Sequence, residues 1–317
     1  MTWLVDKLLP DQSLVAIYGE PSAGKSFLVL DLSLHIAAGL PWQGRPTNQG
    51  SVVYIAAEGR RGLQLRLMAW KFQHGIPMQH SLPIHIIGEA VPLLQPESLG
   101  KLIATLRRLE TPPVLVVVDT LGRSFAGGEE NSNDSMNLAC NAANFIEREL
   151  GCCVAFVHHK GKNAAGMRGG SALEGGVDTA IEVVKEGESD LVTMTCKKQK
   201  DGTKRFAPIF LTLREIPNII DDLSSCVLVS AQPKDIDVDL QGKPRELLTI
   251  FAQKCNMATG ATYSEWYQQS GWSRSTYDDA RRALIENGWV IEPEAKGSLY
   301  QVSPKTRQWV ALNRIVP

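Results

Sequence analysis

Short apolar runs alternate with amphipathic stretches over the first half of the chain. The runs are rich in Val and Ile and cover Ser13–Tyr18, Ser51–Ala57, Ile84–Ile87, Val114–Val118 and Cys152–Val157. Between them, apolar residues recur at helical spacing over Ser26–Ala38, Arg60–His74, Ser98–Leu109 and Ser135–Leu150. Continuous apolar runs joined by helices are typical of parallel strands that are buried on both faces. We therefore predict a doubly wound α/β domain.

Beyond Thr179 the strand-like runs become more closely spaced. A hairpin is predicted at Gly187–Asp190, and further strands at Phe206–Arg214 and Cys226–Ser230. We expect them to extend the same sheet with antiparallel strands. The first domain is therefore predicted to cover residues 1–231.

A second domain is predicted at residues 245–317, after a polar, acidic linker at residues 232–244. Helices are expected at about residues 245–255, 263–270 and 273–287, the last capped by Ser273, and two short strands around Lys296. Three helices followed by a hairpin is the order of a winged helix. We expect Trp266, Trp272 and Trp289 to form its small core.

The composition fits one large core and one small core. The chain has 317 residues, 44% hydrophobic residues and a formal net charge of -1. No apolar run reaches the length of a membrane helix, the N-terminus lacks a signal-peptide layout, and the six cysteines lack the spacing of a zinc site. We expect a cytoplasmic protein with no membrane contact. The part of the chain after about Gly242 has 10 Lys and Arg and 7 Asp and Glu, whereas the part before it has 23 and 27. This small surplus of positive charge after Gly242 suits either a nucleic-acid contact or a solvated surface.

The strongest chemical signal lies between an apolar strand and an amphipathic helix. The sequence there is Gly19-Glu20-Pro21-Ser22-Ala23-Gly24-Lys25-Ser26, which matches the phosphate-binding loop pattern. The glycines let backbone N–H groups surround the phosphates of ATP, and the helix N-terminus adds a favourable dipole. Lys25 is expected to reach the β and γ oxygens, and Ser26 to ligate Mg²⁺. We assign Gly19 through Phe27 to the cofactor site.

Two further predicted strands end in carboxylates. Asp119 follows Val114–Val118, and Glu58 follows Val52–Ala57. Asp119 is expected to complete the magnesium shell, and Glu58 to orient and deprotonate the attacking water. Each has a structural alternative, because Asp119 could cap the next turn and Glu58 could complement the dipole of the following helix.

A histidine pair ends the Cys152–Val157 run. An imidazole at this strand tip could sense the γ-phosphate, and we assign that role to His159. The alternative for His158 and His159 is a structural pair on a surface turn.

Four strand tips in sequence thus carry a phosphate loop, Glu, Asp and His. With Ala56-Ala57-Glu58-Gly59, Val118-Asp119-Thr120-Leu121, Gly127–Asn133 and Phe156–Lys160, the chain resembles the RecA-type hexameric replicative helicases. Among these it resembles the plasmid RepA-like family of AAA-type P-loop ATPases from plasmids, phages and mobile elements. The resemblance spans about Leu14 to Gly202 and implies a RecA-like ATPase core in a ring, with ATP between subunits.

The resemblance also implies that a neighbouring subunit supplies a positive side chain to the ATP site. Lys198-Gln199-Lys200 resembles the Lys-Gln-Arg stretch that has this role in replicative helicases, with Lys200 in place of Arg. Lysine lacks the bidentate fork of arginine. Arg168 is a second candidate, and a solvated hairpin end is the structural alternative for Lys197–Lys200.

Basic residues at two places are candidates for DNA binding. In the loop after the histidine strand these are Lys160, Lys162 and Arg168, and in the tail they are Arg274, Arg281 and Lys296. The first group suits contacts to the backbone of single-stranded DNA in a ring, although the loop could instead sense the nucleotide. The second group suits duplex DNA at a winged helix, although winged helices also dock proteins.

These features predict a homo-oligomeric, hexameric DNA helicase that uses ATP and Mg²⁺. A replication initiator or a primase is a candidate partner. The alternative is a RecA-like ATPase that switches without unwinding, such as a recombination mediator or an ATP-gated DNA-binding regulator.

Overall fold

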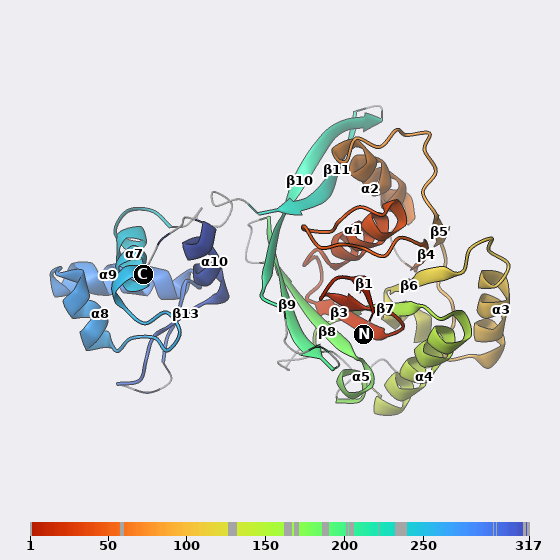
Figure 1. Ribbon diagram of the computed structural model, residues 1–317. Helices are drawn as coiled ribbons and strands as arrows, with labels where there is room; N and C mark the ends of the chain where they lie inside the picture. The colour runs from red at the N-terminus through yellow and green to blue at the C-terminus, as the bar shows by residue number, and fades with distance from the viewer. Residues whose placement is uncertain are drawn as a thin grey trace. The chain divides into compact units, whose positions relative to one another are not determined.

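The computed structural model describes residues 2–57, 60–125, 132–161, 167, 171–185, 190–200, 202, 206–220, 222–231, 240–293, 295, 297–312 and 315. The chain folds into two compact units, Met1–Ser230 and Ala231–Pro317. Figure 1 shows the elements of both, and each unit is described by itself.

A nine-stranded sheet, counted over the described residues, forms the centre of the first unit. Its order is β11-β10-β9-β8-β3-β7-β6-β4-β5. The strands from β8 to β5 in this order are parallel, and β9, β10 and β11 pair antiparallel beyond β8. In chain order the bounds are β3 Leu14–Gly19, β4 Ser51–Ala56, β5 Ile84–Ile87, β6 Pro113–Asp119, β7 Cys153–His159, β8 Thr179–Lys185, β9 Leu191–Gln199, β10 Ile209–Ile220 and β11 Leu223–Ser230.

This arrangement confirms the predicted α/β fold with an antiparallel extension of the parallel sheet. One expectation about the strands was wrong. Strand β5 is not buried on both faces, because it lies at the edge of the sheet and exposes His85 and Ile86. A short hairpin of β1, Trp3–Val5, and β2, Leu9–Pro10, precedes the sheet and was not predicted.

Helices cover both faces of the parallel strands (Figure 1). Alternate residues of each strand enter opposite cores, so Val15 and Ile17 of β3 pack with helices α1 and α2, whereas Ala16 packs with α3 and α4. The same alternation sends Cys153 to the first core and Cys152 to the second. The helices are α1 Lys25–Ala38, α2 Arg60–Gln73, α3 Pro96–Leu106, α4 Asn133–Leu150 and the short α5 Ser171–Gly176, with the 3₁₀ turn η1 at Leu121–Phe125.

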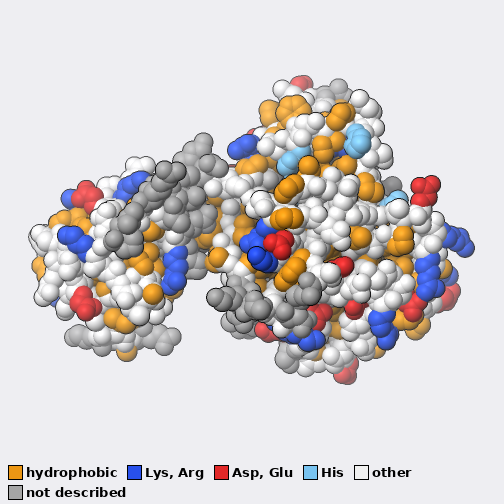
Figure 2. Space-filling model, in the orientation of Figure 1, with side chains coloured by type: hydrophobic (Ala, Val, Ile, Leu, Met, Phe, Trp, Pro, Cys, Tyr) orange, Lys and Arg blue, Asp and Glu red, His pale blue; other side chains and the backbone are white. Residues whose placement is uncertain are grey.

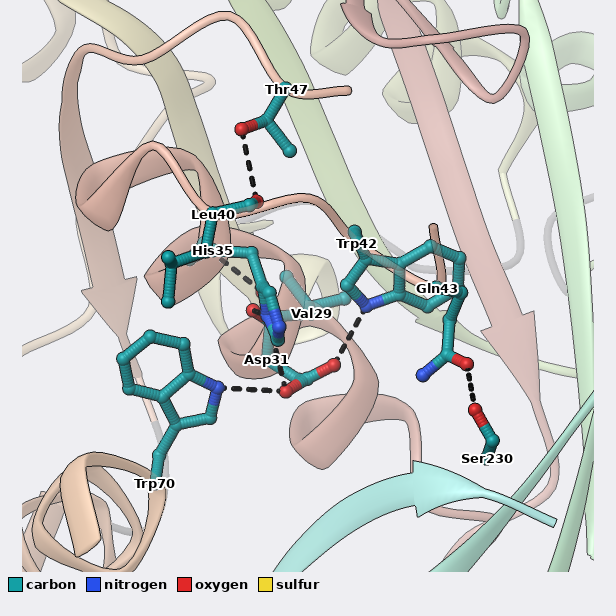
Figure 3. Close-up of polar contacts among 10 residues, drawn as sticks. Val29, Asp31, His35, Leu40, Trp42, Gln43, Thr47, Trp70 and Ser230 are labelled. Carbon is teal, nitrogen blue, oxygen red and sulfur yellow. Dashed lines mark hydrogen bonds and ion pairs between the residues drawn. The ribbon is translucent and has the colours of Figure 1, made fainter. Parts of the chain in front are cut away.

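A buried polar cluster lies between α1 and α2 (Figure 3). The carboxylate of Asp31 accepts hydrogen bonds from the indole N–H groups of Trp42, at 2.7 Å, and Trp70, at 2.8 Å. Burial raises the pKa of Asp31 to about 7, which the two indole hydrogen bonds only partly counteract. Burial also lowers the pKa of the neighbouring His35 and His74, so both imidazoles are neutral at pH 7.

The second unit is a small bundle with a short hairpin. Its elements are α7 Gly242–Lys254, α8 Tyr263–Ser270, α9 Arg274–Glu286, β12 Val290–Ile291, β13 Gln301–Val302 and α10 Pro304–Leu312. Helix α9 is capped by Ser273, whose hydroxyl accepts a hydrogen bond from the Thr276 amide. The linker predicted at residues 232–244 extends too far, because α7 already begins at Gly242. Pro244 lies in the first turn of α7, where a proline removes no intrahelical hydrogen bond.

Tryptophans fill the core of the second unit, with one exception to the prediction. Trp266 and Trp289 are fully buried, whereas Trp272 is half-buried beneath the ammonium of Lys243. Trp309 of α10, a helix that the sequence analysis did not predict, packs against Trp289 instead. Within the described ranges, no helix has the length and apolar character needed to span a membrane.

Two glycines allow a matched test of packing around the sheet. A Cβ at Gly50, which directly precedes β4, would lie 2.4 Å from a methyl carbon of Val114, whereas a Cβ at Gly100 in α3 meets nothing within 4 Å. We expect Gly50→Ala to lower the free energy of unfolding by about 1–3 kcal/mol through overpacking. Gly100→Ala should raise it by about 0.5–1 kcal/mol, because alanine favours the helix. Urea unfolding of the two variants checks both signs, and equal effects would contradict this description of the core.

Candidate active site

The carboxyl ends of the central parallel strands lie in a row at the same end of the sheet. The register pairs Gly19 of β3 with His159 of β7, and Asp119 of β6 with Ala56 of β4. Parallel strands present their ends at the same edge, and this edge is where α/β sheets bind ligands. Glu58, the predicted base, lies outside the described residues, two positions after Ala56.

The loop after β3 has a conformation that depends on its glycines. A Cβ at Gly19 would lie 2.0 Å from the carbonyl oxygen of Val183, so only glycine fits there. Gly24 has a left-handed φ of 90° and is the N-cap of α1, and no side chain caps the helix. The first N–H groups of α1 therefore keep their donors for a phosphate.

Lys25 is held inside this loop. It is buried, and its ammonium donates hydrogen bonds to the carbonyl oxygens of Gly19, at 3.0 Å, and Glu20, at 2.7 Å. These contacts fold the side chain back over the loop, which is the position from which an ammonium reaches phosphate oxygens.

Asp119 lies directly beside the loop and accepts hydrogen bonds from two hydroxyl groups. Ser26 donates to its Oδ1 at 3.1 Å, and Tyr54 of β4 donates to its Oδ2 at 2.6 Å. The structure thus brings the two predicted magnesium ligands together. Tyr54 was missed by the sequence analysis, although a tyrosine within an apolar strand is a signal, because a buried hydroxyl needs a polar partner.

Tyr54 keeps its proton in this position. Full burial and the charge of Asp119 raise its pKa well above the usual value. The phenol is therefore a permanent donor that fixes the orientation of the carboxylate.

His159 ends β7 next to the loop. It is half-buried, and over the described residues its buried Nδ1 has no hydrogen-bond partner. His158 is fully buried, as alternation along the strand requires. Of the two imidazoles, only that of His159 is partly exposed at the strand tips.

A glutamate not considered from the sequence, Glu182 of β8, links two lysines beside the loop. Its oxygens lie 2.8 Å from the ammonium of Lys160 and 2.9 Å from that of Lys197. Partial burial alone would raise the pKa of Glu182, but the hydrogen bonds with both lysines hold it below its usual value. Lys160 also donates its backbone N–H to the carbonyl oxygen of Gly19, so its backbone contacts the phosphate loop while its ammonium contacts β8.

Comparison with known families agrees with this geometry. A family model described as an AAA domain matches residues 1–165, which include Lys25, Asp119 and His159. The chain belongs to the AAA-domain family.

Three solved structures are similar to the chain in fold. One is described as an ATPase domain, with a TM-score of 0.49 and 17% sequence identity over 68% of this chain and 85% of that domain. The RadB recombinase has a TM-score of 0.47 and 14% sequence identity, and the match covers 64% of this chain and 88% of the recombinase chain. A DnaB-like replicative helicase, solved in work on its interactions with primase, has a TM-score of 0.47 and 17% sequence identity. The match covers 64% of this chain and 57% of the helicase chain.

Lys198 and Lys200, the two lysines predicted to reach the ATP site of a neighbouring subunit, lie beyond the segment matched by the AAA-domain model. They lie beside the amino ends of the parallel strands, whereas the phosphate loop lies at the carboxyl ends. Strand β9 runs antiparallel to β8, and its last residues pair with Thr179 and Ala180 at the beginning of β8. The ammonium of Lys198 donates to the carbonyl oxygens of Glu174 and Gly175, and Lys200 pairs with Asp178 at 3.2 Å. Arg168 and Lys162 lie outside the described residues.

The basic residues of the tail take different positions. Arg274 at the start of α9 has a side chain that is 78% exposed. Arg281 points into the unit, where it donates to the hydroxyl of Tyr300 at 2.9 Å and pairs with Asp278 and Glu292. The structure therefore places Arg281 away from the surface that a DNA contact requires. Lys296 lies outside the described residues.

The hydrogen bond from Tyr54 predicts a dependence on magnesium. Tyr54→Phe removes the donor to Asp119, so the magnesium concentration for half-maximal ATP hydrolysis should rise about 10-fold or more, as for other groups that orient a metal ligand. The control is Tyr18→Phe, because Tyr18 packs in the core on the opposite face of the sheet. Steady-state ATPase rates measured against magnesium check the result, and an unchanged magnesium requirement would remove Tyr54 from the site.

Proposed function

We propose that this AAA-domain protein is an ATP-dependent DNA helicase or translocase that acts in the replication of a plasmid, phage or mobile element. In this proposal it forms a homo-oligomeric ring, a hexamer, and hydrolyses ATP at the subunit interfaces. The observation that carries the proposal is the row of strand tips at which Lys25, the Ser26–Asp119 pair and His159 meet.

Each residue of the row has a role in the hydrolysis of Mg-ATP. Lys25 neutralises charge on the β and γ phosphates, and the loop from Gly19 to Phe27 holds the phosphates with its N–H groups. Ser26 and Asp119 bind Mg²⁺, the former directly and the latter through its shell. Glu58 activates water, and the partly exposed imidazole of His159 at the end of β7 detects the γ-phosphate.

The positions of Lys198 and Lys200 support an ATP site that is shared between subunits. The register places Lys198 three residues and Lys200 five residues, or about 10 Å and about 17 Å, from the level of the phosphate loop in the same chain. They therefore serve as fingers for a neighbouring subunit rather than for their own. Lys200, whose side chain is exposed beside Asp178, is better placed for this role than Lys198, which binds the end of α5.

DNA is the proposed substrate, bound as a single strand in the ring. Lys160, Lys162 and Arg168 follow β7, and Lys160 is tied to both Glu182 and the phosphate loop. A change at the loop on ATP hydrolysis would thus reach this basic segment directly. The second unit is proposed to be a winged helix that recruits duplex DNA through Arg274 and Lys296, or a replication initiator or primase. The proposed location is the cytoplasm.

The alternative function is a RecA-like ATPase switch that holds DNA without unwinding it. Glu182 forms ion pairs with Lys160 and Lys197. These ion pairs favour the switch, because they hold Lys160, the first residue of the basic segment after β7, in one position.

Removal of Lys25 tests the ATP site and the motor together. We expect Lys25→Ala to lose at least about 100-fold in ATP turnover, because one preorganised contact to developing charge has this effect, and to lose strand displacement on forked DNA. Lys101→Ala on α3, whose side chain is 76% exposed, is the control. Retained turnover in Lys25→Ala would overturn the site. Turnover without strand displacement in the wild type would favour the switch.

Mixed oligomers test whether Lys200 acts between subunits. Lys25→Ala and Lys200→Ala are each expected to be inactive alone, and a mixture should regain ATPase activity, because some interfaces then combine an intact Lys25 with an intact Lys200. A mixture of Lys25→Ala with the double variant should stay inactive. Full activity of Lys200→Ala alone would contradict the assignment, and the same series with Lys198→Ala compares the two lysines.

A further inference from the structure

We propose that Asp31, His35 and His74 form a binding site for a divalent transition-metal ion, with Zn²⁺ as the ion that we would test. One ligand atom from each residue lies within 4.8 Å of the other two. Asp31 and His35 are buried and His74 is half-buried, so the site opens toward solvent on the side of His74. A carboxylate and two imidazoles are donors that zinc accepts, with a fourth position left for water.

The two helices present these donors on facing sides. Asp31 and His35 are four residues apart on α1, which places both on one face of that helix. Trp70 and His74 have the same spacing along α2 and its C-terminal end, and their rings lie against the His35 ring, with centroids 5.1 Å and 4.7 Å away. A metal ion at this place would join the helix that follows the phosphate loop to α2.

One hydrogen bond of His35 determines which of its two nitrogens could bind a metal. Its Nδ1 lies 2.8 Å from the carbonyl oxygen of Asp31, and a carbonyl can only accept, so Nδ1 carries the proton. The lone pair of the neutral ring is then on Nε2. Donation from the second ring nitrogen to a backbone carbonyl is the arrangement that orients histidine ligands in metalloproteins.

The carboxylate of Asp31 has an outer shell of the same kind. The indoles of Trp42 and Trp70 donate to one oxygen each, which occupies two lone pairs and leaves two (Figure 3). Over the described residues, no lysine or arginine forms an ion pair with Asp31, which is only 3% exposed, and Nδ1 of His35 lies 3.4 Å from its Oδ1. The charged carboxylate is costly to bury, and a bound cation would stabilise that charged form.

Binding requires the side chains to move closer together. Two donors of one tetrahedral zinc ion, at about 2.0–2.1 Å each, are about 3.4 Å apart, so the widest separation of 4.8 Å must close by about 1.4 Å. His74 is the ligand with room to move, since it follows the last residue of α2 and is partly exposed. The site is separate from the magnesium position, because Asp31 is six residues beyond Lys25, about 9 Å along α1.

Metal binding by the full-length protein, freed of metal and without nucleotide, tests the proposal. Equilibrium dialysis against Zn²⁺ should give one ion per chain for the wild type and for His80→Gln, whose histidine is exposed and outside the cluster. His74→Gln should bind at least about 100-fold more weakly, and Trp70→Phe, which loses one indole donor to Asp31, about 10- to 100-fold more weakly. Zn²⁺ should also raise the thermal midpoint of the wild type and not that of His74→Gln.

Co²⁺ provides a second measurement that reports the ligands directly. Bound Co²⁺ should give visible d–d absorption in the wild type that excess Zn²⁺ removes and that His74→Gln lacks. Absence of zinc binding by the folded wild type would overturn the proposal, as would equal binding by wild type and His74→Gln. Because no nucleotide is present, these outcomes do not depend on the function proposed for the ATP site.

Discussion

The hydrogen-bond register of the parallel strands determines where the reactive side chains lie. The ladder sets Gly19 level with His159, and Asp119 level with Ala56. Side chains alternate along a strand, so a shift of one residue in β6 would turn Asp119 away from Ser26 and bury it in the opposite core. The apolar residues on both faces of each strand prevent that shift, because each face has its own helices to fill. The two cores thus specify the site as well as the fold.

Much of the sheet and of the nucleotide loop could be predicted from the sequence because their signals are local. Strand β5 was placed at its observed bounds, and the loop from Gly19 to Ser26 has a spacing that backbone geometry demands. Features that depend on distant partners could not be predicted. Tyr54 acts on a residue 65 positions away, and Glu182 meets Lys160 and Lys197 only after β8 has paired with β3. Helix α10 packs through Trp309, for which no partner is evident before folding.

The partners of the basic side chains could not be predicted from the sequence. Basic residues chosen as contacts for DNA or for a neighbouring subunit prove to have partners within the chain, namely Glu182 for Lys160 and the end of α5 for Lys198. In the second unit Arg281 is similarly engaged. With a net charge of -1, most basic side chains can find an acidic or carbonyl partner, and Figure 2 shows basic side chains dispersed among acidic and apolar ones on one face. Arg274 and Lys200 also have acidic neighbours, Asp278 and Asp178, but their side chains are 78% and 63% exposed.

Helix α1 connects the two polar centres of the first unit. Its first turn carries Lys25 and Ser26, its middle carries Asp31, and its last turn carries His35. A helix transmits displacement along its axis as a nearly rigid rod, because each turn is held by its own hydrogen bonds. The contacts of Asp31 with Trp42 and Trp70 anchor the middle of this rod to α2 and to the segment that follows α1. The cluster around Asp31 and the phosphate loop are therefore connected through a single helix.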